Sequence, residues 1–249
     1  MRTVTFNIRH GVGIDGRLDL ARTAETIAAL EPDVVGLQEV DRHWAERSGF
    51  VDQAGALARR LRMRVAYGAT LDLDPPEPGR PRRRYGNAVL ARFPILGASN
   101  RLLPHTSDVE QRGLLRARVR FDDLAADVYV THLEPQDAAQ RSLQAAAVAT
   151  FLAINPRPRI LLADLNAEPG RPELTSLAAV LRDAWAAGVG RGRTYPANAP
   201  TRRIDAVFHS PDLVAVSAAA PWTTASDHRP VLAVLTPTPT PRPTPAPAA

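Results

Sequence analysis

Alternating apolar and polar positions predict strands and helices in turn through the first part of the chain. Residues 2–8 alternate as in a strand, and residues 19–30 carry apolar side chains at helical spacing until Pro32 ends that helix. Residues 34–37 form a second apolar run, and residues 54–61 again show helical spacing. The chain therefore opens as strand, helix, strand, helix.

From residue 85 onward the pattern changes to strands in direct succession. These predicted strands cover residues 88–91, 95–103, 115–121 and 126–131. Consecutive strands with short links are expected to pair antiparallel. In the third of them Arg116, Arg118 and Arg120 share one face, which places that strand near a sheet edge. A solvated face explains these arginines better than a nucleic-acid contact does.

The most apolar strand ends in polar residues. A long helix over residues 136–154 leads into residues 160–163, which are all apolar, and Asp164 and Asn166 follow. The alternation places both side chains on one face at the carboxyl end of the strand. Asx residues also favour turns, so a functional site and a simple loop start are both open on this stretch alone.

The last part of the chain predicts one more helix and two more strands before a change in composition. Residues 174–181 are a candidate helix, and residues 204–208 and 230–235 are candidate strands. From residue 236 proline stands at every second position, which predicts an extended tail that cannot pair in a sheet. We expect a folded domain over residues 1–235 and a disordered tail over 236–249.

Composition narrows the chemistry. The 249 residues include no cysteine, which excludes disulfides, a cysteine nucleophile and thiolate metal sites. The net charge is +5 and all 31 basic residues are arginine, so no lysine nucleophile is present. Arginine binds phosphate with a forked geometry, and a basic surface suits a phosphate-bearing substrate.

The sequence gives little information about where the protein is located in the cell. No signal-peptide core follows Met1, and no apolar run is long enough to cross a bilayer. We expect a soluble, cytoplasmic monomer without a membrane span. Proline-threonine linkers also occur in exported proteins, so the tail is compatible with export.

Isolated polar residues gather at the ends of the predicted strands. Those at carboxyl ends are Asn7, Glu39, His132 and Asp164, and those at or just before a strand start are Tyr85, Asn87, Asp205, Asp227 and His228. The end of one strand lies beside the beginning of its antiparallel neighbour, so both sets can line a single rim. Hard oxygen ligands without cysteine favour Mg²⁺ or Mn²⁺. Nucleotide-binding P-loop, zinc protease and serine hydrolase motifs are absent, which leaves phosphoester hydrolysis.

A set of short motifs carries a family resemblance. They are Thr-Phe-Asn-Ile-Arg at 5–9, Leu-Gln-Glu at 37–39, Tyr-Gly-Asn at 85–87, Thr-His-Leu at 131–133, Ala-Asp-Leu-Asn at 163–166, Arg-Ile-Asp at 203–205 and Ser-Asp-His-Arg-Pro at 226–230. In this order they resemble the endonuclease/exonuclease/phosphatase superfamily, which contains DNase I. The resemblance implies a four-layer α/β/β/α sandwich of two mixed, largely antiparallel sheets with the active site at one end.

The resemblance also implies roles for the metal-binding and basic groups. Glu39 would be the main ligand of Mg²⁺ or Mn²⁺, Asn7 would assist it, and Asp227 would lie beside the metal. Asp205 would orient His228, which would act as the general base on the attacking water.

The remaining roles concern the phosphate. Asp164 and Asn166 would position water and phosphate, while His132, held by Asn87, would donate a hydrogen bond or proton. Tyr85 and Arg112 would contact the phosphate. Packing at a strand start explains Tyr85 equally well, and an arginine such as Arg112 is more often solvated or paired within a strand. The implied substrate is a phosphodiester, either in a nucleic acid or in a lipid or small-molecule headgroup.

Two positions depart from the family pattern. Arg9 stands where exonuclease III-like relatives carry an acidic metal ligand, which argues against a strict abasic-site repair role. Ala163 replaces a glycine that is common before the Asp-x-Asn pair. These departures keep a second hypothesis open, a non-catalytic phosphate-binding module. The arginines of residues 80–84 form either a solvated loop or a surface that steers an anionic substrate.

Overall fold

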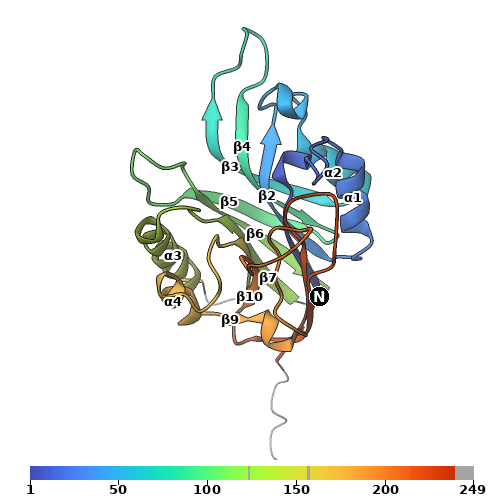
Figure 1. Ribbon diagram of the computed structural model, residues 1–249. Coiled ribbons are helices and arrows are strands. Elements are labelled where there is room, and N and C mark those ends of the chain that lie inside the picture. The colour runs from blue at the N-terminus through green and yellow to red at the C-terminus, as the bar shows by residue number, and fades with distance from the viewer. Residues whose placement is uncertain (123, 156–157, 239–249) are drawn as a thin grey trace, which may run out of the picture.

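Two mixed sheets of six strands each form the body of the protein in a computed structural model that describes residues 1–122, 124–155 and 158–238 (Figure 1). The first sheet has the spatial order β11 (Leu213–Ala219), β12 (Val231–Pro237), β1 (Arg2–Asn7), β2 (Val34–Arg42), β4 (Arg83–Ala91), β3 (Arg64–Leu73). The second has the order β5 (Ile95–Leu102), β6 (Gly113–Phe121), β7 (Leu124–His132), β8 (Arg159–Asp164), β10 (Asp205–His209), β9 (Arg182–Asp183).

Helices cover the outer face of each sheet. Helices α1 (Leu20–Ala28) and α2 (Gln53–Leu61) lie on the first sheet, and α3 (Ala138–Ala153) and α4 (Thr175–Ala178) lie on the second (Figure 1). Each long helix begins at an aspartate whose carboxylate accepts backbone N–H groups of the first turn; these are Asp19, Asp52 and Asp137. The predicted four-layer α/β/β/α sandwich is confirmed.

Three apolar cores hold the layers together. Val34 and Leu162 belong to the core between the two sheets, whereas their neighbours Val35 and Leu161 pack toward the helices. Because strand β8 is buried on both faces, it is apolar at every position from Ile160 to Ala163. Each fully buried Leu or Val side chain contributes roughly 1.5–3 kcal/mol to the free energy of unfolding.

Strand pairing explains why polar residues collect at one end of the sandwich. The pairs β1–β2 and β7–β8 are parallel, so the carboxyl ends of these strands lie at the same end of the molecule. His132 is directly opposite Asp164, and the antiparallel strand β10 places Asp205 opposite Asp164 as well. The predicted rim is therefore a consequence of the pairing.

The two sheets approach each other closely at Gly36 in β2. A Cβ atom at this position would lie 2.6 Å from Cβ of Leu162 and 2.8 Å from Cγ2 of Val130. Two residues later the amide of Gln38 donates to the carbonyl of Leu162 at 3.3 Å and so joins the sheets directly. This close approach lies immediately below the rim.

Some elements differ from the predictions. Strands β3 and β11 were not predicted, and β3 and β11 are the two edge strands of the first sheet. The expectation that all consecutive strands pair is wrong for β4 and β5, because the chain passes from the first sheet to the second between them. The candidate helix over 174–181 is shorter, with a 3₁₀ turn at Pro172–Leu174 followed by α4.

The last strand also ends slightly later than predicted. Strand β12 continues to Pro237, and Thr236 and Pro237 pair with Val214 and Leu213. The prediction that the sequence cannot pair from residue 236 onward is therefore wrong for these two residues, because they lie beside an edge strand that accepts them. Residues 239–249 lie outside the described part of the chain. Among the described helices, none is long and apolar enough to cross a membrane.

Candidate active site

The rim is built from the final inward-facing positions of the central strands. Because side chains alternate along a strand, Asn7, His132, Asp164 and Asp205 continue the rows that fill the space between the sheets. All four are buried. His132 and Asp164 line a cavity of about 400 Å³ together with Glu39, Tyr85, Arg112, Asn166, Asp227 and His228. Asn7 and Asp205 are hydrogen-bonded to two of these residues, Asp164 and His228.

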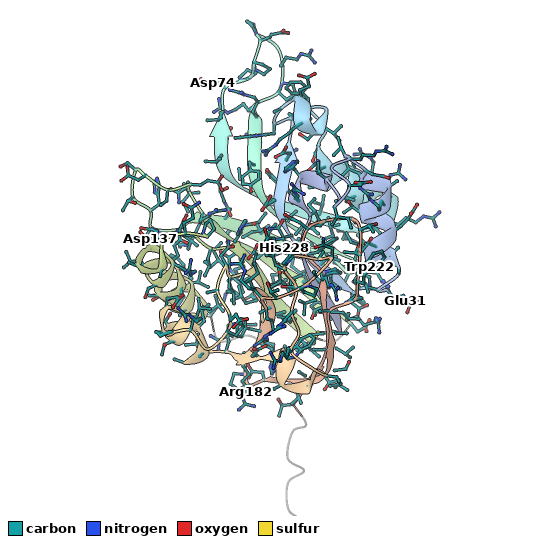
Figure 2. All side chains as sticks on the ribbon, in the orientation of Figure 1. Glu31, Asp74, Asp137, Arg182, Trp222 and His228 are labelled. Carbon is teal, nitrogen blue, oxygen red and sulfur yellow. The ribbon has the colours of Figure 1, made fainter. Side chains whose placement is uncertain are left out.

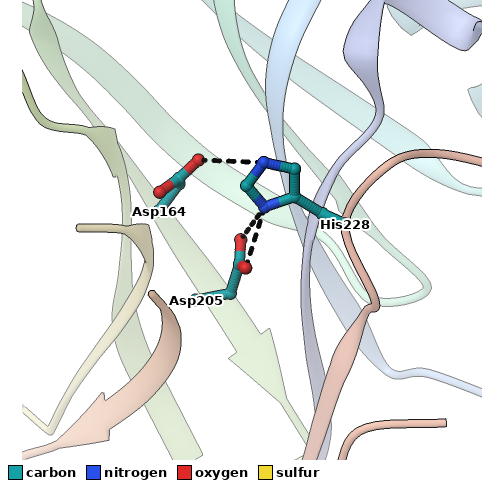
Figure 3. Close-up of side chains that lie close together, drawn as sticks. All are labelled: Asp164, Asp205 and His228. Carbon is teal, nitrogen blue, oxygen red and sulfur yellow. Dashed lines mark hydrogen bonds and ion pairs between the residues drawn. The ribbon is translucent and has the colours of Figure 1, made fainter. Parts of the chain in front are cut away.

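His228 lies between two buried carboxylates (Figure 3). Its Nδ1 atom is 2.9 Å from Oδ2 and 3.1 Å from Oδ1 of Asp205, and its Nε2 atom is 3.8 Å from Oδ2 of Asp164. The ring of Tyr195 lies against the imidazole with 4.8 Å between centroids. Figure 2 shows His228 well inside the body of the molecule, far from Asp74 on the projecting β3–β4 hairpin.

The loop that carries His228 is tied to the first strand. The hydroxyl of Ser226 donates to the carbonyl of Asn7 at 2.7 Å and accepts the backbone N–H of His228 at 3.2 Å. The rim therefore combines the end of β1 with a loop that lies far away in sequence, since Asn7 and Ser226 are 219 residues apart.

These carboxylates change the acidity of the groups around them. Burial alone would lower the pKa of His228, but the negative charges of Asp205 and Asp164 outweigh it and raise the pKa to about 10. Burial, followed by the charge of Asp205, raises the pKa of Asp164. Without a further cation, His228 is a charged imidazolium at neutral pH.

Glu39 reaches the rim through an irregular backbone. In a regular strand it would face the same side as Leu37, toward the helices, but the β2–β4 register shifts between Leu37 and Val40. Glu39 itself has a φ of +57°, in the left-handed region that side chains rarely adopt. The resulting bulge turns its carboxylate to Asn7, whose amide donates to it at 2.9 Å.

The groups around Glu39 fit a hard divalent cation. The side-chain nitrogen of Asn7 donates to Oε1 of Glu39 and to Oδ2 of Asp164, each at 2.9 Å. Asp227 lies across the cavity, and its Oδ2 atom is 3.7 Å from Nε of Arg9. The carboxylate oxygens of Glu39 and Asp227 are ligand atoms that Mg²⁺ and Mn²⁺ prefer, whereas the amide oxygen of Asn7 accepts the backbone N–H of Arg9 at 3.0 Å. Asp164, Asp205 and His228 also offer ligand atoms within 4.8 Å of one another. The Nδ1 atom of His228 is already engaged with Asp205, so this group is better suited to holding a proton.

His132 has a cation as its neighbour. The guanidinium Nη1 of Arg112 is 3.2 Å from Nδ1 of His132, and the Nε2 atom of His132 is 3.4 Å from Oδ2 of Asp164. Burial, then the charges of Arg112 and His228, lower the pKa of His132 well below its usual value.

The prediction that Asn87 holds His132 is wrong, because the amide of Asn87 donates to the carbonyl of Gly113.

Asn166 fits both interpretations that the sequence left open. It has a φ of +51°, and its backbone N–H donates to Oδ1 of Asp164 at 3.0 Å, which is an Asx turn. Its side-chain nitrogen donates to the carbonyl of Leu133 and lies 2.9 Å from Nε2 of His132. The turn is what brings the amide to the rim.

The aromatic and basic residues near the entrance of the cavity differ in how far they are exposed to solvent. Tyr85 is buried and packs against Trp44, with Arg47 over both rings. Arg112 is also buried, so the solvated interpretation of Arg112 is wrong. Arg82 pairs with Asp72 and Asp74, and Arg84 pairs with Asp72, which favours the solvated-loop interpretation of residues 80–84.

Sequence reasoning missed three residues of the cavity wall. They are Glu110, Tyr195 and Arg202. The guanidinium of Arg202 lies over the ring of Tyr195 at 4.9 Å, so these two extend the stack that begins at His228. All three lie on loops outside the predicted strands, where no periodicity marks them.

The fold and the rim of carboxylates and imidazoles are those of a phosphoesterase domain, and comparison with known proteins agrees. The family model described as "Endonuclease/Exonuclease/phosphatase family" matches residues 4–228. The chain belongs to this family, whose members cleave phosphoester bonds.

Individual relatives are distant. The chain is 26% identical to YbhP of Escherichia coli over 93% of this chain and 94% of that protein. It is 29% identical over 63% of its length to the protein cwh43 of Schizosaccharomyces pombe, of which it spans only 15%.

Solved structures show the same fold. An endonuclease/exonuclease/phosphatase from Beutenbergia cavernae has a TM-score of 0.78 and 28% identity, covering 95% of this chain and 71% of that chain. A mannosyl-6-phosphatase from Bacteroides thetaiotaomicron has a TM-score of 0.76 at 18% identity, covering 95% and 99%, and supports the fold alone.

Proposed function

We propose that this protein is a Mg²⁺- or Mn²⁺-dependent phosphodiesterase that uses water as the nucleophile. The observation that carries the proposal is the Asp205–His228 pair, buried at the same rim as Glu39 and separated from it by Asn7 and Asp164. A phosphate-binding module needs no such pair, because a base is required only where a proton must be moved.

Glu39, Asn7 and Asp227 would hold the cation. When bound, the cation would neutralise charge on the phosphoryl oxygens and offset the carboxylates that raise the pKa of His228. The hydrogen-bond between Asn7 and Asp164 would keep the cation site and the base site at a fixed separation.

The protein side chains account for the proton and the phosphate. Neutral His228 takes a proton from water at Nε2, while Asp205 at Nδ1 stabilises the imidazolium that forms. The water oxygen bonds to phosphorus as the bond to the leaving oxygen breaks. Asp164 and Asn166 position the water and the phosphate, and His132 donates a hydrogen bond or proton to the phosphoryl or leaving oxygen.

Hydrolysis of bis-p-nitrophenyl phosphate tests this proposal. We expect turnover with Mg²⁺ or Mn²⁺, loss of turnover with EDTA, and a fall of about 10²–10⁴-fold in kcat for His228→Ala, the range for loss of a general base. His105→Ala is the matched control, because His105 is exposed on a loop. Absence of metal-dependent turnover, or a His228→Ala protein as active as wild type, would contradict the proposal and favour the non-catalytic binding module.

The class of phosphodiester depends on charge at the mouth. The net charge of +5 favours a nucleic acid, whose binding would weaken steeply with added salt. A small phosphodiester or lipid headgroup is a second candidate, because Asp108, Glu134 and Asp137 line a hollow adjoining Arg112 that a phosphate backbone would avoid. Comparing plasmid DNA with phospholipid vesicles at low and high salt distinguishes the two.

A further inference from the structure

A second hollow beside the rim is lined by arginines and, among the described residues, by no acidic side chain. Arg191, Arg193 and Arg229 line it together with Trp185, and its volume is about 470 Å³. We call it the arginine hollow. The chain from residue 184 to 204 contains four arginines and no acidic residue. Within this described lining, no carboxylate offsets the positive charge.

The arginine hollow and the cavity of the rim share a wall. The backbone N–H of Arg229 donates to the carbonyl of Thr194 at 2.9 Å, which holds the loop before β10 against the loop before β12. Tyr195 and His228 line the cavity of the rim, whereas Arg193 and Arg229, on the same two loops, line the arginine hollow. A substrate bound beside His228 therefore has the arginine hollow immediately behind that wall.

The loop that carries Arg191 and Arg193 is held in one shape by Trp185. The indole Nε1 atom donates to the carbonyl of Gly190 at 3.1 Å, and a Cβ atom added to Gly192 would overlap the indole ring. Gly190 and Gly192 have φ angles of +74° and +62°, in the left-handed region that favours glycine. Because the loop is already ordered, a ligand that binds to its arginines pays little conformational entropy.

Another hollow that adjoins the rim has the opposite charge. Its volume is about 610 Å³, and Asp108, Glu110, Glu134 and Asp137 line it around Arg112. Glu110 and Arg112 also line the cavity of the rim. A chain of phosphates bound at the rim is repelled by this acidic hollow and attracted by the arginine hollow. The charges around the rim therefore favour one direction for such a chain.

We propose that the arginine hollow binds a phosphate of a nucleic acid strand while another phosphodiester of the same strand lies at the rim. Arg191 and Arg193 are then specificity-determining residues, because guanidinium groups donate forked hydrogen bonds to phosphate oxygens. This inference rests on the proposed function, and it selects a nucleic acid over a lipid headgroup as the substrate. A strand reaches into a concave hollow, whereas a bilayer presents a flat surface.

Binding of a fluorescein-labelled phosphorothioate oligothymidylate of about 12 nucleotides tests the inference by anisotropy in Mg²⁺. This strand keeps its charge but resists hydrolysis, so the measurement needs no turnover. Each phosphate contact to a single strand adds about eightfold to the affinity at roughly 50 mM salt relative to 1 M. For Arg191→Ala/Arg193→Ala we expect Kd to rise about 60-fold at roughly 50 mM salt and to approach the wild-type value near 1 M.

Arg59→Ala/Arg60→Ala is the matched control, because it removes the same two charges from exposed positions of α2. Helix α2 packs over β2, β4 and β3, whereas Ala218 of β11, at the other edge of the first sheet, lines the arginine hollow. Its Kd should stay within about twofold of wild type, because salt screens distant charges. If the test variant does not fold, Arg191→Ala replaces it, since Arg191 is exposed, and Kd should rise about eightfold.

Hydrolysis adds a second readout that a merely structural role of the arginines would not give. The substrates are unmodified oligothymidylate and bis-p-nitrophenyl phosphate, which has a single phosphate and cannot occupy both places. In Arg191→Ala/Arg193→Ala the ratio of kcat/KM for the oligonucleotide to kcat/KM for the small diester should fall about 60-fold, through KM. A damaged fold would lower both values together.

Three results would overturn the inference. One is a wild-type protein whose oligonucleotide binding is absent or indifferent to salt, and another is equal Kd values for the test and control variants. The third is loss of binding to phosphatidylserine vesicles in the test variant with unchanged oligonucleotide affinity, which would make the arginine hollow a membrane contact. If no diester were hydrolysed while Kd still rose in the test variant, the proposed function would fail and this inference would stand. Hydrolysis of the small diester with equal Kd values would give the reverse.

Discussion

At the scale of single residues, the geometry around His228 makes Asp205 the most consequential carboxylate of the rim. Both of its oxygens lie within 3.1 Å of Nδ1 of His228, and Asp205 is buried. Asp205 therefore selects the tautomer whose Nε2 can accept a proton and stabilises the charge that follows.

We expect Asp205→Asn to lower kcat by about 10³–10⁴-fold, because an amide neither selects that tautomer strongly nor stabilises the imidazolium. The measurement is kcat on bis-p-nitrophenyl phosphate in saturating Mn²⁺, with folding checked by circular dichroism. Asp212→Asn is the control, since Asp212 accepts from Ser210 far from the rim. A folded Asp205→Asn protein within tenfold of wild type would show that the pair does not move the proton.

His132 predicts how stability depends on pH. Its folded-state pKa is lowered by burial and by Arg112, while the unfolded value is about 6.5. Below pH 6.5 His132 binds a proton in the unfolded chain but stays unprotonated in the folded protein. The contribution of His132 to the free energy of unfolding therefore falls as pH falls. The slope from one such group is at most about 1.4 kcal/mol per pH unit.

Urea unfolding in EDTA between pH 7.5 and 5 measures this effect. The stability difference between wild type and His132→Asn should shift in favour of the variant as pH falls, because the variant has no imidazole to protonate. His105→Ala should remain parallel to wild type. Parallel curves for His132→Asn would mean that His132 keeps its ordinary pKa in the fold.

The residues of the rim were predictable individually, but their partners were not. Period-two alternation and strand ends were enough to select Asp164 and His132. The partner of His132 could not be read in the same way, because Arg112 contacts the ring while Asn87 bonds to the carbonyl of Gly113, the residue after Arg112. Distances of a few ångströms decide between them, and alternation carries no such information.

At the scale of elements, the sequence of strand β2 determines how Glu39 reaches the rim. Its apolar run is interrupted by Gly36, where the sheets come too close for a side chain, and its regular alternation ends in the bulge at Glu39. The sequence predicted the strand but ended it at Gln38 and Glu39, because its apolar run stops there. The strand continues to Arg42 through the bulge, and the bulge turns Glu39 toward Asn7.

Gly36→Ala should destabilise the protein without touching the rim directly. The added Cβ would lie 2.6 Å from Cβ of Leu162, so the sheets must separate locally, at a cost of about 1–3 kcal/mol in the free energy of unfolding. Gly97→Ala on β5 is the matched control, because nothing lies within 4 Å of its added Cβ. Equal unfolding free energies for the two variants in urea would refute the close approach.

Edge strands were the elements that the sequence did not reveal. Strand β11 is exposed at many positions, and β3 is exposed or half-buried at most of its length. Without a consistently buried face, neither shows the alternation that marks strand β6. The change of sheet between β4 and β5 could not be predicted for a different reason. A short link is compatible both with a hairpin and with a move to the other sheet.

At the scale of the whole molecule, the rim joins two sheets that are held together by apolar packing and by a few hydrogen bonds such as that from Gln38 to Leu162. Asn7 and Glu39 belong to the first sheet, and Asp164 and Asp205 belong to the second. Apart from hydrogen bonds such as Asn7 to Asp164, the carboxylates repel one another across this junction. A divalent cation held by Glu39 and its neighbours would remove that repulsion and tie the sheets together.

Cation binding should therefore raise the thermal stability of the whole domain. A ligand present at about 100 times its Kd adds about 2.7 kcal/mol, which is roughly 5–10 °C in Tm for a chain of this size. We expect this rise on adding Mn²⁺ to EDTA-treated protein. Glu39→Gln should abolish most of it, whereas Glu25→Gln, on the exposed side of α1, should keep it.

The same melting experiment separates the two groups of possible ligands. If Glu39→Gln kept the full rise and His228→Ala lost it, the cation would be bound by Asp164, Asp205 and His228. His228 would then be a ligand, unable to take a proton from water, and the proposed reaction would lose its base. Retention of the rise in His228→Ala together with its loss in Glu39→Gln is the result expected if the cation and the base occupy separate places on the rim.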